Sequence, residues 1–239
     1  MVPDGSGRQS VTAVRVTTAN HDRTLMEAGE AAEITVDVIR DGGLALVPFD
    51  VAYAFLAGSR EPLEKIYRLK LRPPQKACPI LVSWEQFQQL ADATPEELKR
   101  VENLVRAELP VGVLTKALWD SEIARSIPEN CREFLVSEDR VGLFMNMGGM
   151  SDDLLSVATQ KGLRLFGSSA NLSGMGNSFS IEDVPDEIVD KMDIVCETGA
   201  CKYTNPDRLP SSIIDINTGK LVRRGILHKE IERLLGDRP

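Results

Sequence analysis

The segment "FGSSANLSG", residues 166–174, places three serines, an asparagine and two glycines directly after a short apolar run. The run at 163–166 predicts a buried strand that stops at Gly167. Small residues let backbone N–H groups approach an anion, and hydroxyl and amide side chains add neutral hydrogen-bond donors. The same composition suits an ordinary turn with a Ser or Asn helix cap. Alone, the segment therefore predicts either a turn or one wall of an anion site.

Length, composition and charge restrict the class of protein. The chain has 239 residues, 42% of them hydrophobic, which is enough for one packed α/β domain. Its formal net charge of −8 argues against coating nucleic acid through bulk charge, so an anion site requires a local basic patch. The four cysteines form no C-x-x-C pair, and no apolar run is long enough for a membrane span. We therefore expect no metal site in the protein, no membrane partner and a reducing, cytoplasmic location.

Hydrophobic patterns predict a single domain with strands and helices in alternation. Helices are expected at 23–40, 60–70, 84–91, 95–108, 151–160, 181–190 and 228–235. Strands are expected at 44–48, 78–83, 111–117, 141–145, 163–166, 193–197, 211–216 and 220–224. No stretch has the composition of a linker, so residues 21–239 are predicted to form one α/β domain with a mixed sheet, after a flexible tail at 1–20.

A basic run, "KIYRLKLRPPQK" at 65–76, stands out in this acidic chain because it contains five cations and no acid. One interpretation is a solvated helix face, and the other is a phosphate clamp. Lys70 and Arg72 lie two residues apart at the end of the predicted helix, so in extended backbone both would point the same way. Arg offers a phosphate a planar fork of donors, and Lys offers a point charge.

Five short segments are each a weak signal, but their order along the chain is a specific one. They are "PFDVAYAF" (48–55), "KLRPPQKAC" (70–78), "SANLSG" (169–174), "PSSIID" (210–215) and "RRG" (223–225). In this order they resemble the motifs of the YrdC-like family, which includes the L-threonylcarbamoyladenylate synthases. The resemblance spans roughly residues 28–230, which is nearly the whole chain.

The resemblance implies a twisted mixed sheet with flanking helices and a concave basic cavity. It implies a nucleotidyltransferase that joins ATP, bicarbonate and an amino acid such as threonine into threonylcarbamoyl-adenylate and pyrophosphate, with Mg²⁺ accompanying ATP. In the family this product feeds the threonylcarbamoyladenosine modification of tRNA. Some relatives are described as binding double-stranded RNA, so the alternative is a non-catalytic nucleotide or RNA binder of the same fold. The sequence leaves the oligomeric state open.

The resemblance also assigns roles to individual residues of this chain. The catalytic residues would be Lys70, Arg72, Ser169 and Asn171. The residues that hold the nucleotide and its phosphates would be Lys70, Arg72, Ser169, Asn171 and Arg223. The residues that contact the amino-acid acceptor would be Asp50, Tyr53 and Ser211.

Several positions depart from the family pattern. Phe49 and Val51 replace the two threonines of P-T-D-T, and Phe144 stands where V-G-V-R-x-P has its arginine. In the family those threonines lie near the threonine substrate. A site built around a hydroxyl loses strongly when its hydrogen-bonding group is removed. We therefore expect the phosphate-binding part of the site to match the family and the acceptor-binding part to differ from it.

Overall fold

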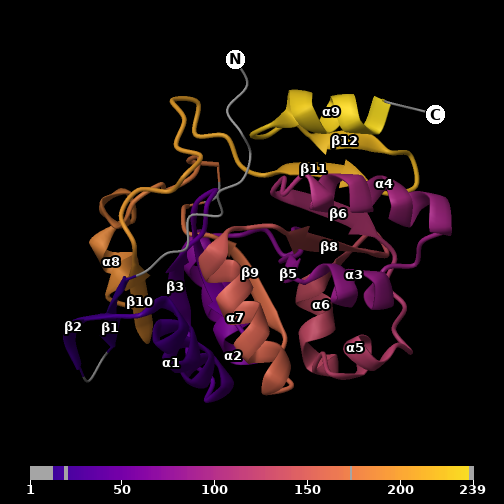
Figure 1. The fold of residues 1–239 in the computed structure, drawn as a ribbon. Coiled ribbons are helices and arrows are strands. Elements are labelled where there is room, and N and C mark those ends of the chain that lie inside the picture. Colours follow the sequence, from indigo (N-terminus) through magenta and orange to yellow (C-terminus); the bar gives the residue numbers. More distant parts are fainter. Residues whose placement is uncertain (1–12, 19–20, 173, 237–239) are drawn as a thin grey trace.

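One mixed sheet runs through the molecule. The computed structural model describes residues 13–18, 21–172 and 174–236. Within these residues twelve strands form the sheet in the order β12-β11-β6-β8-β5-β9-β4-β3-β10-β1-β2, with β7 paired to β8. Figure 1 shows the sheet twisting from β1 and β2 at one end to β11 and β12 at the other. The prediction of an α/β domain with a twisted mixed sheet is confirmed.

The elements have the following bounds. The strands are β1 (Val14–Thr18), β2 (His21–Met26), β3 (Ala45–Pro48), β4 (Tyr53–Ala57), β5 (Ile80–Leu81), β6 (Val111–Thr115), β7 (Val136–Ser137), β8 (Arg140–Met145), β9 (Leu165–Ser169), β10 (Ile194–Glu197), β11 (Ser212–Asp215) and β12 (Lys220–Arg223). The helices are α1 (Ala28–Arg40), α2 (Arg60–Lys70), α3 (Trp84–Leu90), α4 (Pro95–Arg106), α5 (Glu122–Arg125), α6 (Arg132–Leu135), α7 (Gly149–Gln160), α8 (Asp186–Val189) and α9 (His228–Gly236), with short 3₁₀ turns at Glu129–Cys131 and Ile181–Asp183.

Helices cover both faces of the sheet, so its central strands are buried on both sides. In β4, Tyr53 and Phe55 belong to one hydrophobic cluster, which also receives helices α2, α3 and α4. Ala54 and Leu56 point to the opposite cluster, which receives α1 and α7. This two-residue alternation is what a strand with two buried faces requires.

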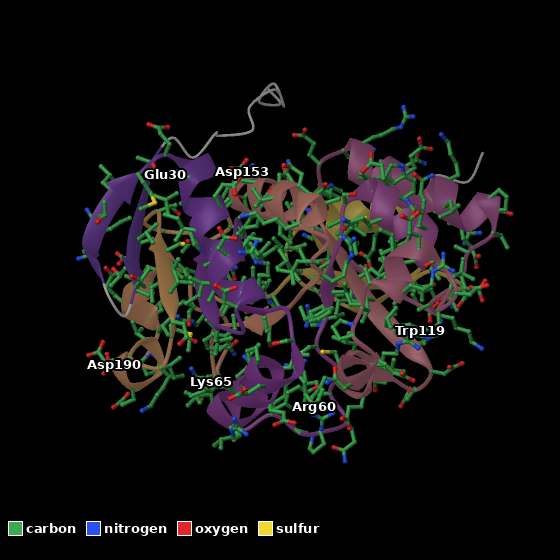
Figure 2. All side chains as sticks on the ribbon, turned by 90° about the horizontal axis from the view of Figure 1, so that it is seen from below. Glu30, Arg60, Lys65, Trp119, Asp153 and Asp190 are labelled. Atoms are coloured by element: carbon green, nitrogen blue, oxygen red, sulfur yellow. The ribbon has the colours of Figure 1, made fainter. Side chains whose placement is uncertain are left out.

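Charged side chains lie on the outside of the molecule. Figure 2 shows the labelled charged side chains Glu30, Arg60, Lys65, Asp153 and Asp190 at the periphery of the molecule. Among the described residues no helix combines the length and the apolar character that a membrane span requires.

The N-terminal predictions need correction. The helix predicted at 23–40 begins only at Ala28, because residues 21–26 form β2. The predicted tail is wrong for Val14–Thr18, which form β1 between β2 and β10. The rest of that tail, residues 1–12, 19 and 20, lies outside the described residues. β1 pairs with β10, far along the chain, and β2 pairs in turn with β1, so pairing decides these strands more than their local pattern does.

The strand predicted at 163–166 is also corrected, since β9 runs on through Gly167 and Ser168 to Ser169. Its partner β4 sets Phe55 opposite Ser168 and Leu56 opposite Gly167. A Cβ added at Gly167 would lie 2.4 Å from the Phe55 carbonyl oxygen, so only glycine fits here. Ser168 and Ser169 are therefore the last two residues of β9, and their positions are fixed by pairing with β4. They do not belong to a turn.

This close approach generates a stability prediction. Gly167→Ala should lower the free energy of unfolding by about 3 kcal/mol, because the new methyl group meets backbone that cannot move aside. The matched control is Gly29→Ala in α1, where an added Cβ has nothing within 4 Å. That change should be neutral or stabilise by up to about 1 kcal/mol. Urea unfolding of both variants measures the difference, and equal effects would contradict the tight pairing of β4 with β9.

Candidate functional site

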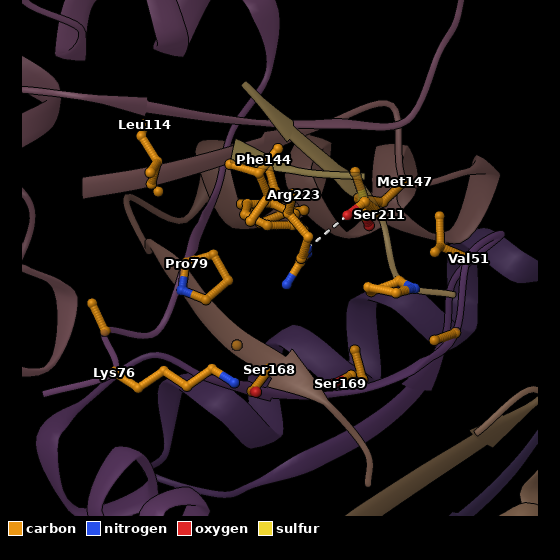
Figure 3. Close-up of a pocket in the computed structure, with 18 of the residues that line it drawn as sticks. Val51, Lys76, Pro79, Leu114, Phe144, Met147, Ser168, Ser169, Ser211 and Arg223 are labelled. Atoms are coloured by element: carbon orange, nitrogen blue, oxygen red, sulfur yellow. Dashed lines mark hydrogen bonds between the residues drawn. The ribbon is translucent and has the colours of Figure 1, made fainter. Parts of the chain in front are cut away.

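A cavity of about 680 Å³ opens beside the end of β9. Its walls come from the turn between β3 and β4, from the segment after α2, and from β8, β9, β11 and β12. Figure 3 shows Val51, Met147 and Ser211 gathered on one side of it and Lys76 on the other, with Arg223 pointing in between. Apolar side chains make up much of the lining, so the few charged groups are the features that could select a ligand.

The segment after α2 anchors Arg72 in the cavity wall. The helix ends at Leu71, whose φ of 48° is left-handed, and the chain turns there. The Arg72 guanidinium then donates to the Lys76 carbonyl oxygen at 2.8 Å and to the Ser168 hydroxyl at 3.0 Å. A further bond runs from Arg72 Nη2 to the carbonyl oxygen of Ala77 at 2.5 Å. These bonds hold the cation rigidly against β9.

Arg223, on β12, is the second anchored cation. Its Nε donates to the Ser211 carbonyl oxygen at 2.9 Å. Burial lowers the pKa of Arg223 to about 10, and the charge of Arg72 adds to the effect. Lys76 is exposed overall, but partial desolvation lowers its pKa, helped by the charges of Arg72 and Arg223. The three cations therefore lie within electrostatic reach of one another.

None of these three cations forms an ion pair with a carboxylate in the part of the chain that the structure describes. The other lining arginine, Arg140, is paired with Asp215. Uncompensated positive charges that repel each other favour an anion between them. The cavity thus has a physical reason to hold a phosphate or carboxylate at this position.

Lys70 has a different position from that expected. It is 2% exposed. Its Nζ donates to the carbonyl oxygens of Ser169 and Asn171, the latter at 2.5 Å, and to Asn171 Oδ1 at 3.2 Å. The Ser169 hydroxyl also bonds to Asn171 Oδ1. Neither Lys70 nor Asn171 lines the cavity. Together they fix the backbone that follows β9.

Burial lowers the pKa of Lys70 to about 7, and the nearby charge of Arg72 acts in the same direction. The three oxygens around Nζ oppose this shift, because they favour the ammonium form. Lys70 is therefore a buried, hydrogen-bonded amine whose loss would leave carbonyl groups without partners.

The expected acceptor residues fall into two groups. Ser211 and Tyr53 line the cavity. The Ser211 hydroxyl lies 3.8 Å from Met147 Sδ. The Tyr53 hydroxyl donates to the Gly199 carbonyl oxygen at 3.3 Å, and burial raises the pKa of Tyr53.

Asp50 lies outside the cavity lining. Its carboxylate packs against Gly148 at the start of α7, where an added Cβ would be 2.2 Å from Asp50 Oδ1. Lys202 Nζ is 3.8 Å from its other oxygen. Burial raises the pKa of Asp50, and Lys202 partly offsets that rise.

The three residues described above as departures from the family pattern all lie on the wall of this cavity. Phe49, Val51 and Phe144 line the cavity. The Phe144 ring lies against Gly112 of β6, where an added Cβ would be 2.7 Å from two ring carbons. The glycine therefore makes room for an aromatic ring where an arginine was expected from the motif.

Five of the eight predicted site residues line the cavity, and other polar residues line it as well. The predicted residues that line the cavity are Arg72, Tyr53, Ser169, Ser211 and Arg223, whereas Lys70, Asn171 and Asp50 do not. Polar lining residues that the sequence-based assignment missed are Gln75, Lys76, Ser137, Glu138, Arg140, Ser168 and Asn177. Lys76 carried a usable signal, since it closes the acid-free basic run at 65–76.

With this geometry in view, the chain can be placed among known proteins. The family model Sua5_yciO_yrdC, described as telomere recombination, matches residues 37–225. The chain therefore belongs to the Sua5/YciO/YrdC family. It is 23% identical over 206 residues to a protein of Methanocaldococcus jannaschii that is provisionally named a threonylcarbamoyl-AMP synthase, covering 84% of this chain and 88% of that protein.

Solved structures of related proteins share the fold. P. abyssi Sua5 complexed with L-threonine has a TM-score of 0.71 at 23% identity, over 89% of this chain and 59% of that one. E. coli YciO has a TM-score of 0.66 at 17% identity, over 84% of this chain and 92% of that one. The chain thus spans nearly all of YciO but less than two thirds of the Sua5 chain.

The contacts of Lys70 lead to a second prediction. Lys70→Met keeps most of the side-chain volume but leaves the Ser169 and Asn171 carbonyls without their donor, so stability should fall by about 1 to 3 kcal/mol. The control is Lys65→Met, which removes only a partly exposed 3.5 Å ion pair with Asp193. That change should cost at most about 1 kcal/mol. Urea unfolding compares the two, and a smaller loss for Lys70→Met than for Lys65→Met would contradict the structural role.

The pKa of Lys70 adds a pH dependence. The folded protein releases this proton near pH 7, whereas the unfolded chain keeps it until near the ordinary value of 10.5. Between these values the unfolded state binds more protons, so the wild type gains stability relative to Lys70→Met as the pH rises. Unfolding of both proteins at about pH 6, 8 and 10 measures this difference. A difference that stays flat or falls would show that Lys70 remains charged.

Proposed function

We propose that the protein is an ATP-dependent nucleotidyltransferase of the threonylcarbamoyl-AMP synthase type, with an altered acceptor site. The observation that carries this proposal is a group of three cations on the wall of one cavity, Arg72, Lys76 and Arg223, which have no acidic partner among the described residues. A triphosphate, bicarbonate and a carbamate are all anions, so a site for them needs cations and neutral donors and no nucleophile. The name of the M. jannaschii relative and the L-threonine in the P. abyssi Sua5 structure support the same chemistry.

The proposed reaction has two steps. The amine of the acceptor and bicarbonate combine into a carbamate and water. A carbamate oxygen then attacks the α-phosphorus of ATP, the bond to the β-phosphate oxygen breaks, and pyrophosphate leaves. Catalysis by positioning and charge stabilisation suits such a transfer.

In this reaction Arg72 and Arg223 are assigned to the phosphate groups. Arg72 has already used two of its donors on backbone carbonyls, which fixes its plane before the ligand arrives. Ser168 and Ser169 supply neutral groups at the end of β9. Lys70 and Asn171 position Ser169, and Arg72 contacts the Ser168 hydroxyl. Preorganised donors of this kind act without reorganising during the reaction.

Mg²⁺ is expected to arrive with ATP. Among the described residues no group of three or more His, Cys, Asp or Glu side chains could hold a metal ion. Phosphate oxygens and water are ligands that Mg²⁺ accepts readily. The proposal therefore assigns the ion to the nucleotide complex and gives it no dedicated protein site.

The test compares two adjacent arginines. Arg223→Gln should lower kcat/KM for ATP by about 100-fold, because a charged hydrogen bond to phosphate is lost. Arg224→Gln is the matched control, since Arg224 does not line the cavity and pairs with Glu232 at 2.8 Å with 72% of its side chain exposed. Pyrophosphate release with ATP, labelled bicarbonate and a panel of amino acids, together with mass detection of the acyl-adenylate, measures both variants.

The same assay separates the proposal from its alternative. A wild-type protein that binds ATP but forms no acyl-adenylate with any amino acid would be a binder without this activity. Binding of double-stranded RNA would show as affinity that falls steeply with salt concentration. Equal losses for Arg223→Gln and Arg224→Gln would contradict the assignment of the cavity.

A further inference from the structure

The two ends of the cavity differ in their exposure to solvent. At one end Gln75, Lys76 and Glu138 are exposed. At the other end Val51 and Met147 are 4% and 3% exposed. The first end is therefore open to solvent, and the second is enclosed.

The enclosed end is built from the β3–β4 turn and the segment that precedes α7. The Asp50 backbone N–H donates to the Met147 carbonyl oxygen at 2.7 Å, which joins the two segments. Phe49 and Val51 flank Asp50 and face the cavity. Figure 3 shows Val51 and Met147 on the same side as Ser211. The walls at this end are thus mainly aliphatic and aromatic.

Four polar side chains near this end each make one bond or contact within the protein. The pairs are Ser169 Oγ with Asn171 Oδ1, Tyr53 Oη with Gly199 O at 3.3 Å, Asn177 Nδ2 with Leu209 O at 3.2 Å, and Ser211 Oγ with Met147 Sδ at 3.8 Å. A hydroxyl group brought in by a ligand would exchange its bonds to water for the remaining capacity of these few, already engaged groups. An apolar group of the same size would lose nothing.

The chemistry of the proposed reaction decides which part of the substrate lies at which end. Carbamates and their mixed anhydrides with phosphate are destroyed by water, so the acyl part belongs where water is excluded. Pyrophosphate has to leave, and the open end beside Lys76 gives it a path. Arg223 lies between the two ends and is placed to contact the α-phosphate that joins them.

We infer that the acceptor is an α-amino acid whose side chain is apolar and lacks a hydroxyl, with valine as the probe. This inference rests on the proposed function and specifies its substrate. Valine and threonine have nearly the same shape, so their comparison isolates the exchange of a methyl for a hydroxyl group. An apolar pocket discriminates such a pair by about 10- to 100-fold.

The experiment measures the preference in two ways. Initial rates of acyl-adenylate formation with ATP, bicarbonate and either valine or threonine give kcat/KM for each amino acid. Calorimetric titration of valine and of threonine into the full chain, loaded with a non-hydrolysable ATP analogue, gives the same preference without turnover. We expect valine to be favoured by about 10- to 100-fold in both measurements.

A pair of variants assigns the preference to the enclosed end. Val51→Thr introduces a hydroxyl there and should shift the ratio toward threonine by about tenfold. Val195→Thr in β10 is the control, because it makes the same change at a residue with 6% exposure that does not line the cavity. It should leave the ratio unchanged, although both substitutions lower stability.

The outcomes separate this inference from the proposed function. If threonine equals or exceeds valine in rate and binding, the inference is wrong while adenylate formation stands. If no amino acid yields an acyl-adenylate, the proposed function is wrong, and calorimetry that shows no preference for valine overturns the inference as well. A shift of equal size for Val51→Thr and Val195→Thr would also overturn it.

Discussion

The antiparallel pairing of β4 with β9 is the constraint on which the site depends. Its register sets Ala54 opposite Ser169 and Leu56 opposite Gly167. The approach is so close at Gly167 that a Cβ would collide with the Phe55 carbonyl oxygen. Because β4 follows directly from the β3–β4 turn, this register brings the turn and the serines of β9 to the same edge of the sheet. The cavity forms where they meet.

The end of α2 shows how backbone conformation separates two neighbouring cations. Leu71 is left-handed, so the chain turns between Lys70 and Arg72. Lys70 contacts the backbone of the segment after β9 from the interior, whereas Arg72 lines the cavity. The extended backbone in which both side chains would point the same way is absent here, because Leu71 is left-handed. In this chain the K-x-R segment therefore combines Lys70, which holds backbone in place, with Arg72, which lines the cavity.

Much of the sheet could be predicted from the sequence because its central strands are continuous apolar runs buried on both faces, as in β3 and β6. The strands β1 and β2 could not, because they are rich in polar residues: β1 pairs with β10, far along the chain, and β2 pairs with β1. The order of five short motifs predicted the family. It did not predict that Lys70 and Asn171 would bond to each other, because side-chain direction there depends on the left-handed turn and on the end of β9.

The cavity carries positive charges, whereas the chain as a whole is negatively charged. This contrast bears on the size of the ligand. The chain carries a net charge of −8, which repels extended polyanions at long range. At distances below a Debye length of roughly 8 Å, Arg72, Lys76 and Arg223, which have no carboxylate partner among the described residues, dominate. An anion small enough to enter a space of about 680 Å³ comes within that range of them. The proposed nucleotide is an anion of this kind, so these cations could attract it locally although the chain as a whole is acidic.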